Sequence, residues 1–343
     1  MNRAIILRCM FTAGLLVGCT QDQPTSERSV TAALPSGPLP NLATRSNNCT
    51  PNTHPGGSIV DVVTTPPAWA IAVRDDGLAY FAESYNAGVG ITSTKTRKVD
   101  GFIPTGDVPT GIAFSPDGAT AYVANQLDNN VSVINTATAQ VTATISTGFY
   151  ATFAVQVSLD GSRLFIGTNQ NVVYIVDTGN NQIIGTAIVG DAPNAFVVAP
   201  DNRIIYVSSF VGATVTELDM LTGTALRTFF VGGRPQGMAI TRKADRLYVA
   251  NEGGYLSEIA LQTGQIAASI PLAGGGFGVG VTPDDNQAWV TIPDQGKVQV
   301  FNLNNRRLSL GLNVGGQPRR LGFSQHGGIG AIADLSGFVT FVR

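Results

Sequence analysis

Apolar residues recur along this chain in short alternating runs that are separated by polar turns. From Ser58 onward each unit has a Pro-containing turn or its equivalent, an apolar strand, a polar turn that often contains Asp, a second apolar strand and two further short strands. Seven such units without helical periodicity predict an all-β, seven-bladed β-propeller with four-stranded antiparallel blades. The second strand of each unit carries an aromatic or apolar residue 41 to 43 residues after its predecessor, at Tyr80, Tyr122, Phe165, Tyr206, Tyr248, Trp289 and Ala331.

The two ends of the repeat region predict how the ring closes. The last unit ends at Arg343 after three strands, and an unassigned apolar strand at residues 58–65 precedes the first unit. We expect this N-terminal strand to supply the fourth strand of the last blade, which leaves no exposed sheet edge at the junction. Residues 58–343 are therefore predicted to form one propeller domain.

The first 57 residues differ from the repeats. An apolar stretch at residues 4–17 follows Arg3 and is too short to span a bilayer stably, so residues 1–18 are predicted to be a signal peptide. Leu16-Val17-Gly18-Cys19 resembles the bacterial lipobox. That resemblance implies cleavage before Cys19, lipidation of its thiol and a lipoprotein anchored in the cell envelope. Ordinary signal-peptidase cleavage, which leaves Cys19 free, is the alternative.

Residues 19–57 are rich in Pro, Ser, Thr and Asn and are predicted to form a disordered tether behind the lipidated cysteine. Thr20, rather than Asp, follows Cys19, which resembles lipoproteins sorted to the outer membrane. The expected location is thus the outer membrane or the periplasm-facing envelope, with the membrane as a partner and a monomeric propeller beyond the tether.

Composition and charge fit this picture and remove one class of partner. Charged residues make up 13% of the chain and there are 40 glycines, as expected for short buried strands joined by tight turns. The formal net charge of −2 provides no basic field for nucleic acid, so nucleic-acid binding is not expected.

Two copies of one tetrapeptide make the repeat more specific. Tyr122-Val123-Ala124-Asn125 and Tyr248-Val249-Ala250-Asn251, followed by strands such as Val131–Asn135, resemble the YVTN repeat of bacterial surface-layer and YncE-like β-propellers. Such propellers include binding proteins, a DNA-binding periplasmic protein and relatives of lactonases. The resemblance implies the fold and leaves the ligand open.

Antiparallel strand order places the start of the first strand and the end of the second on one face of each blade. At that face we predict a ligand-binding rim of aromatic, amide and guanidinium groups, which suit capture of a protein, peptide, glycan or other organic ligand. The alternative is that Trp69, Phe153 and Phe277 fill the core and that Arg319 pairs with Asp334. The rim candidates are Trp69, Phe153, Asn194, Gln236, Phe277, Arg319 and Arg320.

Glu83 and Asp334 are the only catalytic candidates. They belong to the first and seventh blades, which ring closure makes neighbours, beside Arg319 and Arg320. The set could orient a substrate for lactonase-like hydrolysis, although a structural ion-pair cluster is the commoner outcome. Single-stranded DNA binding through these arginines is a third alternative.

Histidine and cysteine are too scarce for most cofactor chemistry. The chain has two histidines, His54 in the tether and His326, and Cys49 is the only cysteine beyond the lipobox. No metal centre, haem site or other cofactor is therefore expected. Together these features predict a binding or interaction scaffold rather than an enzyme.

Overall fold

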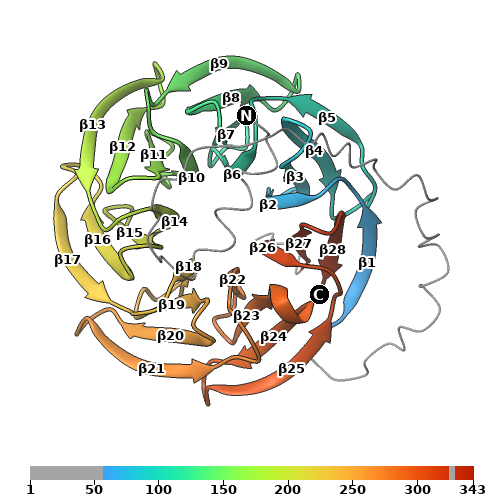
Figure 1. Ribbon diagram of the computed structural model, residues 1–343, viewed down its shortest axis with the longest axis vertical. Helices are drawn as coiled ribbons and strands as arrows, with labels where there is room; N and C mark the ends of the chain where they lie inside the picture. The colour runs from blue at the N-terminus through green and yellow to red at the C-terminus, as the bar shows by residue number, and fades with distance from the viewer. Residues whose placement is uncertain (1–56, 324–328) are drawn as a thin grey trace, which may run out of the picture. The chain divides into compact units, whose positions relative to one another are not determined.

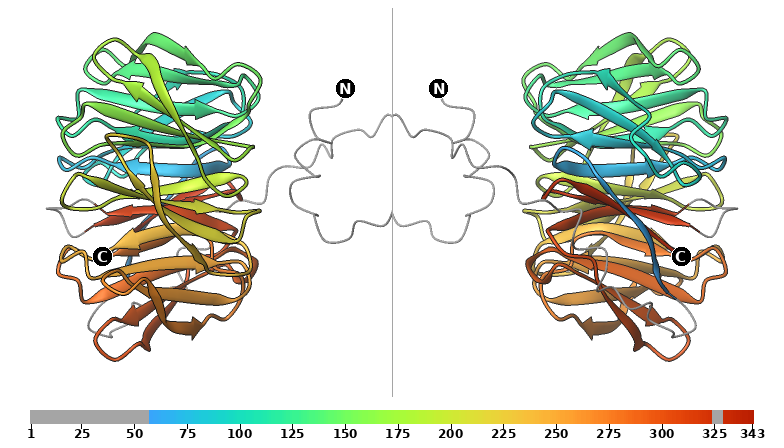
Figure 2. Two further views of the ribbon diagram at one scale, coloured as in Figure 1. Left: turned by 90° about the vertical axis from the view of Figure 1, so that its left-hand side faces the viewer. Right: turned by 90° about the vertical axis from the view of Figure 1, so that its right-hand side faces the viewer.

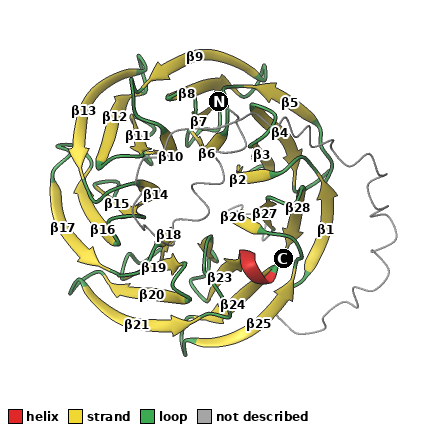
Figure 3. Ribbon diagram, in the orientation of Figure 1, coloured by secondary structure: helices red, strands yellow, loops and turns green. Residues whose placement is uncertain are grey.

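The computed structural model describes residues 57–323 and 329–343, and these form seven four-stranded antiparallel sheets arranged as a ring (Figure 1). The predicted seven-bladed all-β propeller is confirmed. The described part of the chain contains one short helical turn, the 3-10 helix η3 (Pro293–Gln295), as Figure 3 shows. No helix in that part is long and apolar enough to cross a membrane. The signal peptide, Cys19, the tether up to residue 56, Cys49, His54 and His326 lie outside the described residues.

The first four blades follow the chain in order from the inner to the outer strand. Blade 1 contains β2 (Ala68–Val73), β3 (Leu78–Glu83), β4 (Gly88–Ser93) and β5 (Gly101–Pro104). Blade 2 contains β6 (Pro109–Phe114), β7 (Thr120–Asn125), β8 (Asn130–Asn135) and β9 (Gln140–Ser146). Blade 3 contains β10 (Thr152–Val157), β11 (Arg163–Thr168), β12 (Val172–Asp177) and β13 (Gln182–Ile188). Blade 4 contains β14 (Pro193–Val198), β15 (Ile204–Ser209), β16 (Thr214–Asp219) and β17 (Ala225–Phe230).

The remaining three blades complete the ring. Blade 5 contains β18 (Pro235–Ile240), β19 (Arg246–Asn251), β20 (Tyr255–Ala260) and β21 (Gln265–Pro271). Blade 6 contains β22 (Val279–Val281), β23 (Gln287–Ile292), β24 (Lys297–Asn302) and β25 (Arg307–Asn313). Blade 7 contains β26 (Pro318–Phe323), β27 (Gly330–Asp334), β28 (Phe338–Val342) and, as its outer strand, β1 (Ile59–Thr64).

Strand β1 closes the ring as predicted. It pairs antiparallel with β28, and Ser58 and Arg343 exchange main-chain hydrogen bonds of 2.8 and 2.9 Å at the end of the pair. Blade 7 is thus built from both ends of the repeat region, and Figure 1 shows β1 lying outside β28. The inner strands of neighbouring blades contact one another all the way round, from β2 through β26 and back to β2.

The core lies between the blades. All seven repeat-marking residues of the second strands are at most 4% exposed, which confirms their role as packing residues. Because side chains alternate across a strand, each blade packs one set of apolar side chains against each of its two neighbouring blades. The outermost strands carry mainly exposed residues, and Figure 2 shows strands running between the two opposite faces of the ring.

Polar turns join the inner and second strands on one face. In blade 2 the Oγ of Ser115 donates to Asp117 at 2.5 Å, and the main-chain N–H of Ala119 donates to the same carboxylate at 3.0 Å. Gly118 adopts a φ of 69°, which a glycine tolerates without strain. These turns therefore lie on the face opposite to the predicted rim.

Candidate functional site

The inner strands begin at one face of the ring with a local irregularity that positions the predicted site residues. In six of the seven blades the pairing between the inner and second strands slips immediately after its first pair. A β-bulge of this kind releases a residue from the regular alternation and turns its side chain. The residues within or beside these bulges are Trp69, Thr110, Phe153, Asn194, Gln236, Arg319 and Arg320.

Blade 6 departs from this pattern. Its inner strand β22 starts only at Val279, after the glycine run at residues 274–276. Gly276 donates a 2.9 Å main-chain hydrogen bond to Asn251, and a Cβ on Gly274 would lie 2.5 Å from the carboxylate oxygens of Asp294. The run therefore packs closely against both blade 5 and Asp294 of blade 6, and regular strand pairing begins only after it.

Arg319 lies between two aromatic rings from different blades. Its guanidinium carbon is 4.9 Å from the ring centre of Trp69 and 4.6 Å from that of Phe277. The two rings meet edge to face at 5.5 Å. Arg319 and Phe277 are buried, whereas Trp69 is half-buried. Phe277 is thus a buried packing residue, and the two rings together hold a guanidinium at the channel mouth by cation–π contact.

Burial lowers the pKa of the Arg319 guanidinium to about 10, while the carboxylates of Glu252 and Asp334 act in the opposite direction. The side chain remains protonated at neutral pH. A cation with little hydration gains more from each polar ligand contact than an exposed one. Arg319 is accordingly a buried cation at this face.

A pocket of about 610 Å³ opens beside Arg319. Its wall combines hydrogen-bond donors with acceptors and apolar side chains. The two carboxylates in the wall belong to Glu252 and Asp294, which the sequence analysis did not single out. The residues that line the pocket are Glu252, Gly275, Phe277, Pro293, Asp294, Gly316, Gln317 and Arg319. We call this the mouth pocket.

A chain of amide hydrogen bonds leads from blade 4 to the mouth pocket. The Oγ of Ser208 donates to Asn194 at 2.9 Å, and Nδ2 of Asn194 donates to Gln236 at 2.7 Å. Nε2 of Gln236 then donates to Oε1 of Glu252 at 2.7 Å, and the other oxygen of Glu252 lies 3.8 Å from Arg234. These contacts fix the orientation of Glu252, so its carboxylate is preorganised at the pocket wall.

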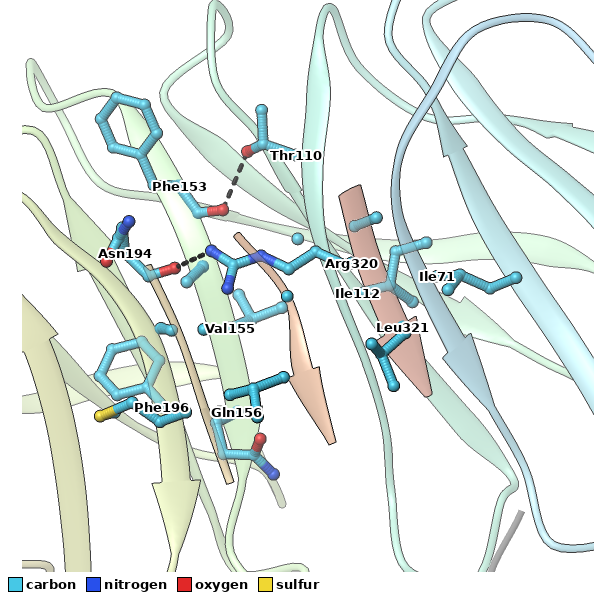
Figure 4. Close-up of a pocket in the computed structure, with 18 residues that line it drawn as sticks. Ile71, Thr110, Ile112, Phe153, Val155, Gln156, Asn194, Phe196, Arg320 and Leu321 are labelled. Atoms are coloured by element: carbon cyan, nitrogen blue, oxygen red, sulfur yellow. Dashed lines mark hydrogen bonds between the residues drawn. The ribbon is translucent and has the colours of Figure 1, made fainter. Parts of the chain in front are cut away.

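Arg320 points in a different direction from Arg319. It leaves β26 of blade 7, and its Nη2 donates a 2.9 Å hydrogen bond to the main-chain oxygen of Asn194 in blade 4, as Figure 4 shows. The guanidinium also lies 5.1 Å from the ring centre of Phe277. Phe153 lies near this crossing, where its main-chain oxygen accepts a 3.0 Å hydrogen bond from Thr110. One side chain therefore bridges the channel.

The two catalytic candidates lie outside the wall of the mouth pocket. Oε2 of Glu83 accepts a 2.8 Å hydrogen bond from Asn86, and burial raises the pKa of the Glu83 carboxyl. Oδ1 of Asp334 accepts main-chain hydrogen bonds from Gln317 at 2.9 Å and Ser336 at 2.6 Å, and burial raises the pKa of this carboxyl too. Asp334 interacts electrostatically with Arg319, whereas Glu83 is bound within its own blade.

Glu252 and Asp294 are the site residues that sequence reasoning missed. Glu252 comes one residue after the last residue of β19, and Asp294 comes two residues after the last residue of β23, so extending the predicted rim from the ends of the second strands into the following turns would have included both. Among the described residues there is no group of three His, Cys, Asp or Glu side chains that could hold a metal ion.

Comparisons with known proteins agree on the architecture. The chain is a seven-bladed β-propeller. A family model described as "Lactonase, 7-bladed beta-propeller" matches residues 92–224, which run from blade 1 into blade 4. The chain is also similar in structure to Kuenenia stuttgartiensis hydrazine synthase, with a TM-score of 0.75 and 18% identity over 81% of this chain and 96% of that one. This likeness concerns the fold alone, and a search of curated proteins finds no match.

Proposed function

We propose that this protein is a binding module of the cell envelope that captures a polyhydroxylated ligand, such as a glycan segment, in the mouth pocket. One observation carries the proposal: the pocket wall combines hydrogen-bond donors and acceptors, and one of the acceptors, Glu252, is held in place by Gln236. Arg319 and Gln317 supply N–H groups, and Glu252 and Asp294 supply carboxylate oxygens. A hydroxyl group both donates and accepts hydrogen bonds, so a sugar uses both kinds of partner. A simple anion would meet two carboxylates.

The size and floor of the pocket support the same ligand class. About 610 Å³ is the range of small-molecule sites, and Phe277 with Pro293 gives the pocket an apolar base against which the faces of a sugar ring pack. Glu252 is held by Gln236, so little ordering accompanies binding.

The test is isothermal titration of the full-length protein with a panel of neutral and acidic oligosaccharides. Arg319→Gln and Asp294→Asn each remove a charged hydrogen-bonding partner, which is worth about 1.5 to 3 kcal/mol, or roughly 10- to 100-fold in affinity. Arg307→Gln, which changes an exposed arginine on the outer strand β25, is the matched control and should bind normally. If Arg319→Gln and Asp294→Asn bound as tightly as the wild type and Arg307→Gln, the mouth pocket would not be the binding site.

Membrane anchoring is a separate part of the proposal and rests on the lipobox. If Cys19 is lipidated, metabolic labelling with a palmitate analogue marks the intact protein, and Cys19→Ala abolishes the label and releases the propeller into the soluble fraction. Retention of the label in Cys19→Ala would refute the anchor. The expected location remains the outer membrane or the periplasm-facing envelope.

Lactone hydrolysis is the second candidate, because the lactonase family model matches part of the ring. In the mouth pocket Glu252 would accept a proton from water as that water attacks the lactone carbonyl. Arg319 would stabilise the resulting oxyanion, and protonated Glu252 would return its proton to the ring oxygen as the C–O bond breaks, which yields a hydroxy acid. Both residues lie outside residues 92–224, so the match supports the fold more than this site.

A titrimetric assay with a panel of sugar lactones tests this candidate. Glu252→Gln should lower kcat by 10²-fold or more if Glu252 is the general base. Glu83→Gln and Asp334→Asn test the two carboxylates that the sequence suggested. Hydrolysis that survives all three substitutions would exclude these three carboxylates as the general base.

A further inference from the structure

Inside the ring, below the mouth pocket, Arg320 lies in a cavity of about 190 Å³. The inner strands of the blades line this cavity, and Figure 4 shows Arg320 reaching across it from β26 towards β14. Among the described residues that line it there is no Asp or Glu. The polar side chains beside Arg320 are Thr110, Gln156 and Asn194, all neutral. The cavity thus contains a fixed positive charge and no fixed negative charge.

The guanidinium of Arg320 uses few of its hydrogen-bond donors. It has five N–H donors. Within residues 57–323 and 329–343 it makes one hydrogen bond, to the main-chain oxygen of Asn194, and no ion pair. By contrast, Arg227, Arg246 and Arg306 of the same ring each pair with a buried glutamate. Arg320 is therefore a cation whose remaining donors face the channel.

Its neighbour adds to the positive potential. Burial lowers the pKa of the Arg320 guanidinium to about 10, and the charge of Arg319 lowers it further in the same direction. An anion beside Arg320 would offset both effects, because it replaces lost hydration and screens the repulsion between the two arginines.

The backbone around the cavity can contribute further donors. An inner strand of a blade pairs on one side only, so its other edge presents N–H and C=O groups to the channel. The carbonyl of Asn194 is one such group and is already bonded to Arg320. N–H groups at such an edge bind anions readily. Gly237 and Gly278 also line the cavity, but their N–H groups already donate to the main-chain oxygen of Phe277 and to Oγ1 of Thr291, so the free donors near Arg320 must come from other positions of these edges.

We infer that the channel holds an internal binding site for one compact oxyanion, of the size of phosphate, sulfate or a short carboxylate, bound by Arg320 and the inner-strand edges. This site goes beyond the mouth pocket and needs a different ligand: the mouth pocket has two carboxylates and suits hydroxyl groups, whereas the channel cavity has none and suits a negative charge. The cavity volume limits the ligand to a compact ion.

The first experiment titrates the full-length protein with phosphate, sulfate, selenate and acetate and records the melting temperature and the heat of binding. We expect at least one oxyanion to bind and to raise the melting temperature. Arg320→Gln should weaken its binding at least tenfold, since a charge-assisted contact is lost. Arg320→Lys, which keeps the charge and loses the planar fork, should retain part of the binding.

Arg307→Gln is again the matched control. Arg307 is exposed on the outer strand β25 and lines neither the cavity nor the mouth pocket, so the variant should bind the oxyanion normally. Arg319→Gln separates the two sites, because it should impair glycan binding at the mouth far more than oxyanion binding in the channel.

Diffraction from crystals soaked in selenate gives the position directly, with an anomalous peak expected next to Arg320. Three results would overturn the inference: no binding of any of the four ions, unchanged binding in Arg320→Gln, or a peak at the mouth pocket and none in the channel. The first two results leave sugar binding at the mouth untouched, and the oligosaccharide titration tests that binding separately, so failure of this site and failure of the mouth pocket are distinguishable.

Discussion

Asp334 in blade 7 occupies the same structural position as Asn251 in blade 5. Oδ1 of Asn251 accepts main-chain hydrogen bonds from Arg234 at 2.9 Å and Gly253 at 2.8 Å. Oδ1 of Asp334 accepts the equivalent pair from Gln317 and Ser336. Both side chains thus fasten the turn after the second strand to the turn before the inner strand. For Asp334 this is a structural role that an amide performs equally well.

Asp334→Asn should therefore fold normally and be more stable at neutral pH. Burial raises the pKa of the Asp334 carboxyl in the folded state above its value in the unfolded chain. The stability that this carboxyl contributes is therefore complete at pH values below its unfolded-state pKa. That contribution is lost as the pH rises through its folded-state pKa. Asparagine does not ionise. We expect the melting temperature of Asp334→Asn to exceed that of the wild type by about 2 °C at pH 7 and the difference to vanish in acid.

Thermal unfolding monitored by circular dichroism between pH 3 and 8 measures this difference. A variant that loses stability at pH 7 would show that the charge on Asp334, through its interaction with Arg319, outweighs the effect of burial.

The sequence predicted the repeat more completely than the site. The repeat could be predicted because the same packing requirement recurs in every blade, as the burial of Tyr80 and Trp289 illustrates. Ring closure followed from a missing strand at one end and a surplus strand at the other. Both inferences depend on periodicity, which a single sequence contains in full.

The site depends on contacts that periodicity does not specify. Arg319 and Arg320 are adjacent on one strand, yet both contact Phe277, because the bulge in β26 breaks the alternation of side chains. Glu252 interacts with Arg319 across blade 6, whose inner strand starts late. The hydrogen bond from Arg320 to Asn194 joins residues 126 apart in sequence and was not foreseeable from either repeat.

Gly237 tests the close approach of the inner strands around the channel. A Cβ at Gly237 would lie 2.8 Å from the main-chain oxygen of Phe277 and 2.9 Å from the main-chain nitrogen of Val279. Both are backbone atoms, so the clash could be relieved only by moving the neighbouring strand. Gly237→Ala should destabilise the ring by about 1 to 3 kcal/mol. Gly311→Ala is the control, since a Cβ there meets nothing within 4 Å. Urea denaturation compares the two, and equal midpoints would contradict this account of inner-strand packing.

Glu258 joins blades 5 and 6 through a buried ion pair. Its fully buried carboxylate accepts hydrogen bonds from Arg306 at 2.8 and 3.0 Å and contacts Arg246 on the neighbouring strand. Glu258→Ala removes a hydrogen-bonded carboxylate from two partly exposed arginines and should cost about 1 to 3 kcal/mol, because water solvates the guanidinium groups once the carboxylate is gone.

Asp76→Ala is the matched control for Glu258→Ala. Asp76 is exposed and pairs with Arg74 within its own turn, so its loss should cost at most about 1 kcal/mol. Chemical denaturation gives both values. A small effect of Glu258→Ala, similar to that of Asp76→Ala, would mean that the two arginines find other partners and that this pair does not hold the blades together.

Two neighbouring residues of β1 test whether pairing and packing of this strand close the ring. Val63 packs against the core cluster shared by blades 1 and 7, whereas Val62 is half exposed on the other side of the strand. Val63→Asp places a charge in the apolar contact and should cost about 1 to 3 kcal/mol, while Val62→Asp should be nearly neutral. Once β1 detaches, β28 becomes an open sheet edge, so Val63→Asp should also associate into dimers or larger species. Denaturation and size-exclusion chromatography measure both effects. If Val63→Asp were as stable and as monodisperse as Val62→Asp, main-chain pairing alone would be sufficient to close the ring.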